Sequence, residues 1–141
     1  MSWQSYIDDN LLASGFCYAA ICGFDGSPWA NSPGFQLLPE EATLLSKVLS
    51  EGNIDTIASN GFTVAGQKYA FTRADLDDEE AAPSIQGRCK EEGLSGRGLI
   101  VMKSNQALIV GVHDPEYTSA TFRQVNLDMT NLANYLMENG F

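Results

Sequence analysis

Residues 99–113, LIVMKSNQALIVGVH, contain two apolar runs of strand length separated by a short polar stretch. We expect strands at Leu99–Lys103 and Ala107–His113, with a turn at Ser104-Asn105 between them. This is the clearest strand signal in the chain. We therefore start from these two strands and consider first the residues that follow them and then those that precede them.

The segment that follows is the most periodic of the sequence and predicts a C-terminal helix beginning near Ser119. Its apolar residues recur at helical spacing and form one stripe: Val125, Met129, Leu132 and Leu136. Tyr135 lies about 100° round the helix from Leu136, at the margin of the stripe.

Before residue 99, the pattern predicts three more strands. They are Phe62–Ala65, Lys68–Arg73 and Ile85–Lys90, and Gly66-Gln67 joins the first two tightly. The connections after the second and third strands differ in character. Residues 75–83 form an acidic loop with five acids between Asp75 and Glu80, and residues 91–98 form a glycine-rich loop.

The first part of the chain predicts two helices and a hairpin. One helix is expected from Trp3 to Ala13, with Ser2 as its N-cap, and another from Pro39 to Gly52. Between them, FCYAAICGF at 16–24 is expected to be a buried strand whose hairpin partner carries Trp29. Because no β-α-β units alternate along the chain, the order indicates an α+β domain with a central antiparallel sheet. A length of 141 residues fits one domain, 1–141.

Composition excludes several classes of protein. The net charge is −10 with only eight Lys and Arg, whereas nucleic-acid binding needs many cations against phosphates. No apolar run approaches the ~20 residues that span a bilayer. The three cysteines, Cys17, Cys22 and Cys89, are expected to be free thiols in a reducing cytosol.

The sequence also gives no sign of catalysis. His113 is the single histidine and falls in an apolar strand, where a structural role is the simpler interpretation. We find no phosphate loop, zinc spacing or nucleophile elbow. The protein is therefore expected not to be an enzyme and to use no cofactor or metal.

Aromatic residues gather at both ends of the chain. Trp3 and Tyr6 share one face of the first helix, beside its Ile7 and Leu11 core stripe. For these two alone, ordinary helix packing is the simpler interpretation. Tyr135 and Phe141 add rings at the other end. If the terminal helices lie side by side, the rings form one shallow groove suited to a polyproline II helix.

The sequence resembles the profilins over nearly its whole length. The opening MSWQSYIDDNLL and the closing LANYLMENGF are similar to that family's terminal signatures, and AAICGFDGSPWA, NGFTVAGQKYAFTR and QALIVGV to its strands. The resemblance implies a central antiparallel sheet with the N- and C-terminal helices on one face and short helices on the other. It also implies a cytoplasmic, cytoskeleton-associated monomer that binds monomeric actin and proline-rich proteins such as formin-type nucleators. Such a protein delivers actin to growing filament ends and promotes nucleotide exchange on it.

The resemblance assigns two sets of site residues. The proline-peptide site is expected at Trp3, Tyr6, Trp29, Tyr135, Leu136 and Phe141. The actin-binding face is expected at Lys68, Arg73, Arg88, Lys90 and Asn126. Basic residues suit the acidic actin monomer, although each taken singly could be a solubilising charge at a sheet edge.

The chain departs from the family pattern in three places. Phe141 replaces a common tyrosine, Leu127 stands where some relatives have a basic residue, and loops 75–83 and 91–98 are long and acidic. Phosphoinositide binding is also implied, yet it needs basic surface that is thin here. The alternative function is a small-ligand-binding α+β sensor domain without actin binding, which would need a cavity inside the core.

Overall fold

The computed structural model describes residues 3–77, 82–94 and 96–141. The predicted N-cap Ser2 and part of the acidic loop, residues 78–81, lie outside these ranges. The strands are β1 (Tyr18–Cys22), β2 (Pro28–Asn31), β3 (Phe62–Val64), β4 (Gln67–Asp75), β5 (Ser84–Cys89), β6 (Gly98–Lys103) and β7 (Leu108–His113).

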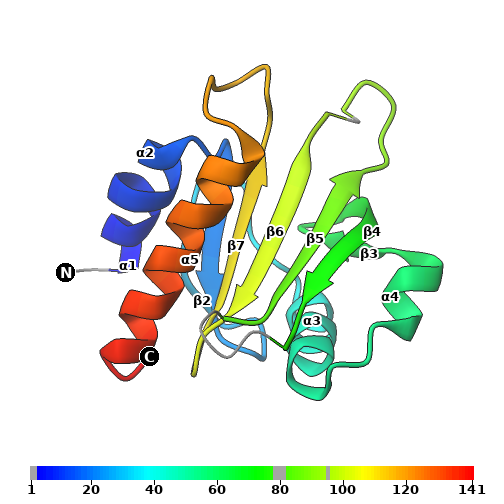
Figure 1. Cartoon of the computed structure of the whole chain (residues 1–141), viewed down its shortest axis with the longest axis horizontal. Coiled ribbons are helices and arrows are strands. Elements are labelled where there is room, and N and C mark those ends of the chain that lie inside the picture. The colour runs from blue at the N-terminus through cyan, green and yellow to red at the C-terminus, as the bar shows by residue number, and fades with distance from the viewer. Residues whose placement is uncertain (1–2, 78–81, 95) are drawn as a thin grey trace.

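All described strands pair antiparallel in one sheet, in the order β2-β1-β7-β6-β5-β4-β3 (Figure 1). The β6–β7 hairpin holds the middle, with Val101 opposite Val110. This confirms the α+β class and the central antiparallel sheet.

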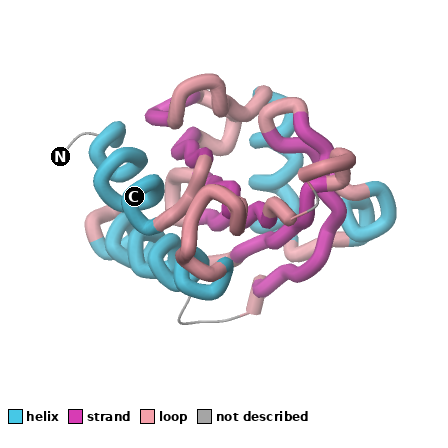
Figure 2. The backbone as a smooth tube through the Cα atoms, turned by 90° about the horizontal axis from the view of Figure 1, so that it is seen from above, coloured by secondary structure: helices cyan, strands magenta, loops and turns pink. Residues whose placement is uncertain are grey.

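The helices occupy both faces of the sheet. The N-terminal helix has three segments, α1 (Trp3–Ser5), η1 (Tyr6–Leu11) and α2 (Leu12–Ser14), and the other helices are α3 (Pro39–Glu51), α4 (Asp55–Asn60) and α5 (Phe122–Glu138). The N-terminal helix and α5 run side by side over one face, while α3 and α4 lie on the other (Figures 1 and 2). The middle segment η1 has π-helical geometry, which is frequent at functional sites.

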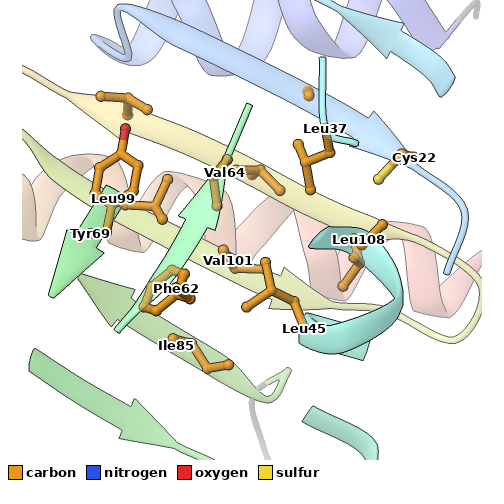
Figure 3. Packing of buried hydrophobic residues seen from close by; sticks show 14 of the residues in the cluster. Cys22, Leu37, Leu45, Phe62, Val64, Tyr69, Ile85, Leu99, Val101 and Leu108 are labelled. Carbon is orange, nitrogen blue, oxygen red and sulfur yellow. The ribbon is translucent and has the colours of Figure 1, made fainter. Parts of the chain in front are cut away.

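Two apolar layers fill the space between the sheet and its helices. Under α3 and α4, Leu45, Phe62 and Val101 belong to one buried cluster (Figure 3). Under the terminal helices, Ile7, Met129 and Leu136 belong to a second. The predicted stripe of the C-terminal helix is thus confirmed as core.

One helix was missed by the sequence prediction, and the bounds of several other elements differ from it by one to three residues. The helix α4 was missed because six residues with one buried apolar side chain, Ile57, carry no detectable period. The helix α5 begins at Phe122 rather than near Ser119, because Thr121 is its N-cap and exchanges hydrogen bonds with Gln124. The strand β4 continues past Arg73 to Asp75.

A buried carboxylate fixes the β3–β4 turn against α3. Glu41 is only 4% exposed. Its oxygens accept hydrogen bonds from the backbone N–H groups of Ala65 at 2.7 Å, Gly66 at 2.9 Å and Leu38 at 2.8 Å. The turn itself needs positive φ at two successive residues, 52° at Ala65 and 81° at Gly66. Glu41 therefore stabilises a backbone conformation that Ala65 seldom adopts.

The three cysteines are free thiols, as predicted. Burial raises the pKa of the Cys22 thiol to about 12, so it is protonated and inert at neutral pH. None of the helices within 3–77, 82–94 and 96–141 has the length and apolar character that a bilayer crossing requires.

Candidate functional site

Trp3 stands at the centre of a cluster of aromatic rings that come from both ends of the chain and from β2. Its ring centroid lies 4.7 Å from that of Trp29, 5.1 Å from that of Phe141 and 5.5 Å from that of Tyr6. Tyr6 in turn lies 6.2 Å from Tyr135. These spacings are those of interacting aromatic pairs. We call these five residues the ring cluster.

Hydrogen bonds from the β6–β7 turn hold the C-terminal end of the cluster in place. The main-chain oxygen of Phe141 accepts from the Ser104 hydroxyl at 2.9 Å and from the Gln106 backbone N–H at 2.5 Å. The Gln106 side chain donates to the Gly140 carbonyl at 3.1 Å. Phe141 is therefore anchored and does not fray as terminal residues often do.

The ring cluster faces outward. Tyr135 and Phe141 are 47% and 40% exposed, and Trp3, Tyr6 and Trp29 are half-buried. Leu136, the sixth expected residue of the proline-peptide site, is only 1% exposed. Its side chain belongs to the core stripe of α5, so in this conformation it supports the site from below and has no surface for a ligand.

The Tyr6 hydroxyl interacts with the side chain of Tyr135. Burial, the neighbouring Tyr135 and a side-chain hydrogen bond with it raise the pKa of Tyr6 above its usual value. Tyrosine is already protonated at neutral pH at its usual pKa of about 10, and the shift keeps it so. Indole and phenol donors at the surface of a ring cluster match the unpaired carbonyls of proline-rich chains.

The basic residues assigned to the second site lie on one face of β4 and β5. Ala70 pairs with Arg88 and Tyr69 with Cys89, which puts Lys68 and Arg88 on the same side of the sheet. Lys90 follows directly after β5, where its N–H donates to the Lys68 carbonyl at 3.1 Å and continues this pairing. Arg73 is an odd number of positions from Lys68 and would point the other way in a regular strand. A bulge between Phe71 and Arg73 shifts the register, so that Arg73 pairs with Gln86. Because Gln86 points to the same side as Arg88, Arg73 also points to the side of Lys68.

All four basic side chains are exposed, and α5 borders the face they share. A hollow of about 100 Å³ joins Arg73 on β4, Gln86 on β5 and Asn126 on α5. The Asn126 Oδ1 atom is buried there and accepts no hydrogen bond from the described residues. Leu127, where a basic residue was expected in some relatives, is 59% exposed. The structure thus brings the five predicted residues onto one face, which we call the basic face.

His113 occupies a structural position, in agreement with the prediction. It is 5% exposed, and its Nε2 lies 2.7 Å from the Ala120 carbonyl oxygen. Its ring meets Phe122 edge to face.

Sequence reasoning missed a groove that leads away from the ring cluster. It lies between the N-terminal helix and α5 and has a volume of about 610 Å³. Its lining residues are Tyr6, Asp9, Asn10, Ala13, Ser14, Asp128, Asn131, Leu132 and Tyr135. The available signal was that mostly polar residues recur at i, i+3 and i+4 spacing along both helices. The groove lies outside the core and does not supply the internal cavity that the small-ligand alternative requires.

A curled antiparallel sheet with both terminal helices on one face, α3 and α4 on the other, and an outward ring cluster where the two chain ends meet defines a profilin-type architecture. The family model described as Profilin matches residues 1–141. Profilin-1B of Acanthamoeba castellanii is 37% identical over 142 residues, with 100% of both chains covered. The chain therefore belongs to the profilin family.

Solved structures agree. The crystal structure of Acanthamoeba castellanii profilin II has a TM-score of 0.80 and 33% identity, covering 99% of this chain and 100% of that one. Mouse profilin IIa, solved in complex with a double repeat from the FH1 domain of mDia1, has a TM-score of 0.78 at 23% identity and covers 100% of both chains. LokiProfilin1, solved in complex with rabbit actin, has a TM-score of 0.62 at 17% identity, covering 93% of this chain and 90% of that one. The last two likenesses show the fold alone.

Proposed function

We propose that this profilin binds an actin monomer through the basic face and proline-rich segments through the ring cluster. By holding both, it delivers monomers to proline-rich nucleators and elongators of formin type. The observation that carries the proposal is the position of Trp3, whose ring contacts rings from the first hairpin and from the last residue at once.

The ring cluster suits a polyproline II ligand for three physical reasons. Its rings are flat, partly exposed and fixed, so proline rings can stack on them with little loss of side-chain entropy. Its phenol and indole groups can donate to the unpaired peptide carbonyls. The peptide arrives with preset dihedrals and loses little entropy on docking. Leu136 takes part only as the buried support beneath the rings.

The basic face suits an acidic protein surface. Four of the eight Lys and Arg residues of a chain with net charge −10 point from the same side of β4 and β5. A local positive patch on an otherwise acidic protein steers an acidic partner to that patch and fixes its orientation. The Asn126 oxygen beside it is an acceptor that a partner's donor would satisfy.

The two sites lie far enough apart to be occupied together. Trp29 lies on β2, at one edge of the sheet, and the basic face begins four strands away on β5. At ~4.8 Å per strand this separation is roughly 19 Å across the sheet. The protein would act by bridging, without chemistry of its own, in the cytoplasm where actin assembles. Phosphoinositide binding stays a prediction, as does the monomeric state.

A pyrene-actin assembly assay tests the proposal. Added alone, the protein should slow spontaneous nucleation by sequestering monomers. With a proline-rich nucleator fragment, it should support elongation that a fragment with its prolines replaced does not. If assembly is unaffected in both arms, the proposal is wrong.

A further inference from the structure

The groove between the terminal helices begins at the ring cluster, since Tyr6 and Tyr135 line both. The N-terminal helix and α5 lie side by side in both views of the backbone (Figures 1 and 2). From the ring cluster, the groove runs between these two helices towards α2. Its volume of about 610 Å³ is within the ~300–1,000 Å³ of ordinary ligand sites. The residues that flank a peptide bound to the ring cluster can therefore lie in this groove.

The chemistry of the groove changes along its length. Its lining residues on α5, at 128, 131, 132 and 135, follow helical i, i+3, i+4, i+7 spacing and form one stripe. Leu132, 5% exposed, gives it an apolar floor. The residues past Tyr6 and Tyr135 are mostly polar, and two of them, Asp9 and Asp128, are exposed carboxylates.

Among the described residues, these two carboxylates have no hydrogen-bonding or ion-pair partner. Within 3–77, 82–94 and 96–141, neither Asp9 nor Asp128 accepts a hydrogen bond or forms an ion pair, and no Lys or Arg lines the groove. Two uncompensated negative charges facing one groove favour a cation there.

We propose that this groove recognises the residues flanking a proline-rich ligand and selects lysine or arginine. The inference rests on the proposed proline-peptide site and adds a charge preference to it. Asp128 is seven residues from Tyr135, a rise of about 10 Å along α5. A polyproline II chain covers this in about three to four residues at ~3.1 Å each. Lysine or arginine just outside the proline run, with its long side chain, therefore reaches Asp9 and Asp128.

The test uses three peptides with the same eight-proline run, flanked at both ends by two lysines, two serines or two glutamates. Binding to the full-length protein is measured by isothermal titration calorimetry at low and high salt. We expect lysine-flanked peptide to bind about fivefold more tightly than serine-flanked peptide, and glutamate-flanked peptide more weakly than either. The differences should shrink at about 0.5 M salt, because exposed charge pairs are screened.

Two variants locate the effect. In Asp9→Asn/Asp128→Asn, the lysine preference should disappear while serine-flanked peptide binds as before. The matched control is Glu40→Gln/Glu51→Gln, which removes two exposed carboxylates from α3 on the opposite face of the sheet and should keep the preference.

The outcomes separate this inference from the function on which it rests. Equal affinity for all three peptides overturns the inference and leaves the proline-peptide site intact. Loss of the preference in the Glu40/Glu51 control also overturns it, because net charge would then be the cause. Failure of every peptide to bind the wild-type protein overturns the proline-peptide site itself and the inference with it.

Discussion

The ring of Trp3 meets the ring of Phe141 edge to face, with centroids 5.1 Å apart and planes at 89°. The first described residue and the last residue of the chain are thus in direct contact. This contact closes the ring cluster, because it joins the aromatic residues of the N-terminal helix to those that follow α5. The site depends on tertiary structure and not on any single motif.

Trp3→Ala should abolish most proline-peptide binding and leave the fold in place. The ring contacts three others in the cluster, and removing a central aromatic of that kind from an interface costs at least ~2 kcal/mol, or about 30-fold in affinity. Trp3 is half-buried in the first turn of its helix, so stability should fall only modestly. Calorimetric titration with a proline decamer measures the first effect, and thermal unfolding by circular dichroism the second.

Tyr117→Ala is the matched control, since Tyr117 is 64% exposed and lies outside the ring cluster. It should bind the decamer normally. If Trp3→Ala unfolds the domain, the ring is a core residue and the site assignment is wrong.

Lys68→Glu/Arg73→Glu should weaken actin sequestration without changing proline-peptide affinity. Both side chains lie on the basic face, and reversing them puts like charge against an acidic partner, with a loss of at least roughly tenfold in affinity. The critical concentration of pyrene-actin at increasing protein concentration reports the change. Lys47→Glu/Lys103→Glu, an equal charge change away from this face, should sequester normally. Sequestration that survives the first pair would reject the basic face as the actin site.

Much of the ring cluster could be predicted from the sequence, and there are physical reasons why the rest could not. The terminal aromatics stood beside a clear core stripe, so an outward ring cluster could be inferred. Leu136 was assigned to the peptide site by resemblance, although its place in that stripe already indicated burial. Trp29 lies on a four-residue strand with no period of its own, so only the resemblance to profilins assigned it to the peptide site, and its contact with Trp3 joins it to the ring cluster.

The basic face shows a different limit. The spacing of Lys68 and Arg73 predicts opposite faces, and the bulge that unites them leaves no signature in a single sequence. Helix α4 was missed for a related reason, because six residues with one buried side chain are too few to show a helical repeat. The position and type of the long, periodic helices and strands could be predicted from the sequence. Short features such as α4 and the β4 bulge could not, because tertiary packing determines them.

Glu41→Ala should destabilise the fold far more than the loss of an exposed carboxylate does. It would leave three backbone N–H groups, of Leu38, Ala65 and Gly66, without their acceptor in a partly buried site. We expect a loss of about 2–4 kcal/mol in the free energy of unfolding, measured by urea denaturation. Glu41→Gln keeps one acceptor oxygen and should lose less. A change within ~0.5 kcal/mol for the alanine variant would contradict the role given to this carboxylate.

The Asp114–Arg97 pair should make stability fall in acid. Hydrogen bonds from the Glu116 backbone N–H and the Arg97 side chain hold the pKa of Asp114 below its usual value. A depressed folded-state pKa stabilises the protein above the unfolded value of ~3.9, and this contribution is lost as pH falls through the folded pKa. Asp114→Asn should thus be less stable than wild type at pH 7, and the two should converge as the pH falls below the folded-state pKa of Asp114. Urea unfolding at several pH values measures this, and a pH-independent difference would refute it.

Trp3 and Trp29, whose rings lie 4.7 Å apart, form part of the outward surface that we propose binds proline-rich chains. Titration of the wild-type protein with a proline decamer, followed by tryptophan emission, tests this binding most directly. We predict a saturable change in emission with a dissociation constant in the micromolar to submillimolar range, absent with a glycine-serine peptide of equal length. Emission that stays constant up to several millimolar decamer would contradict the claim.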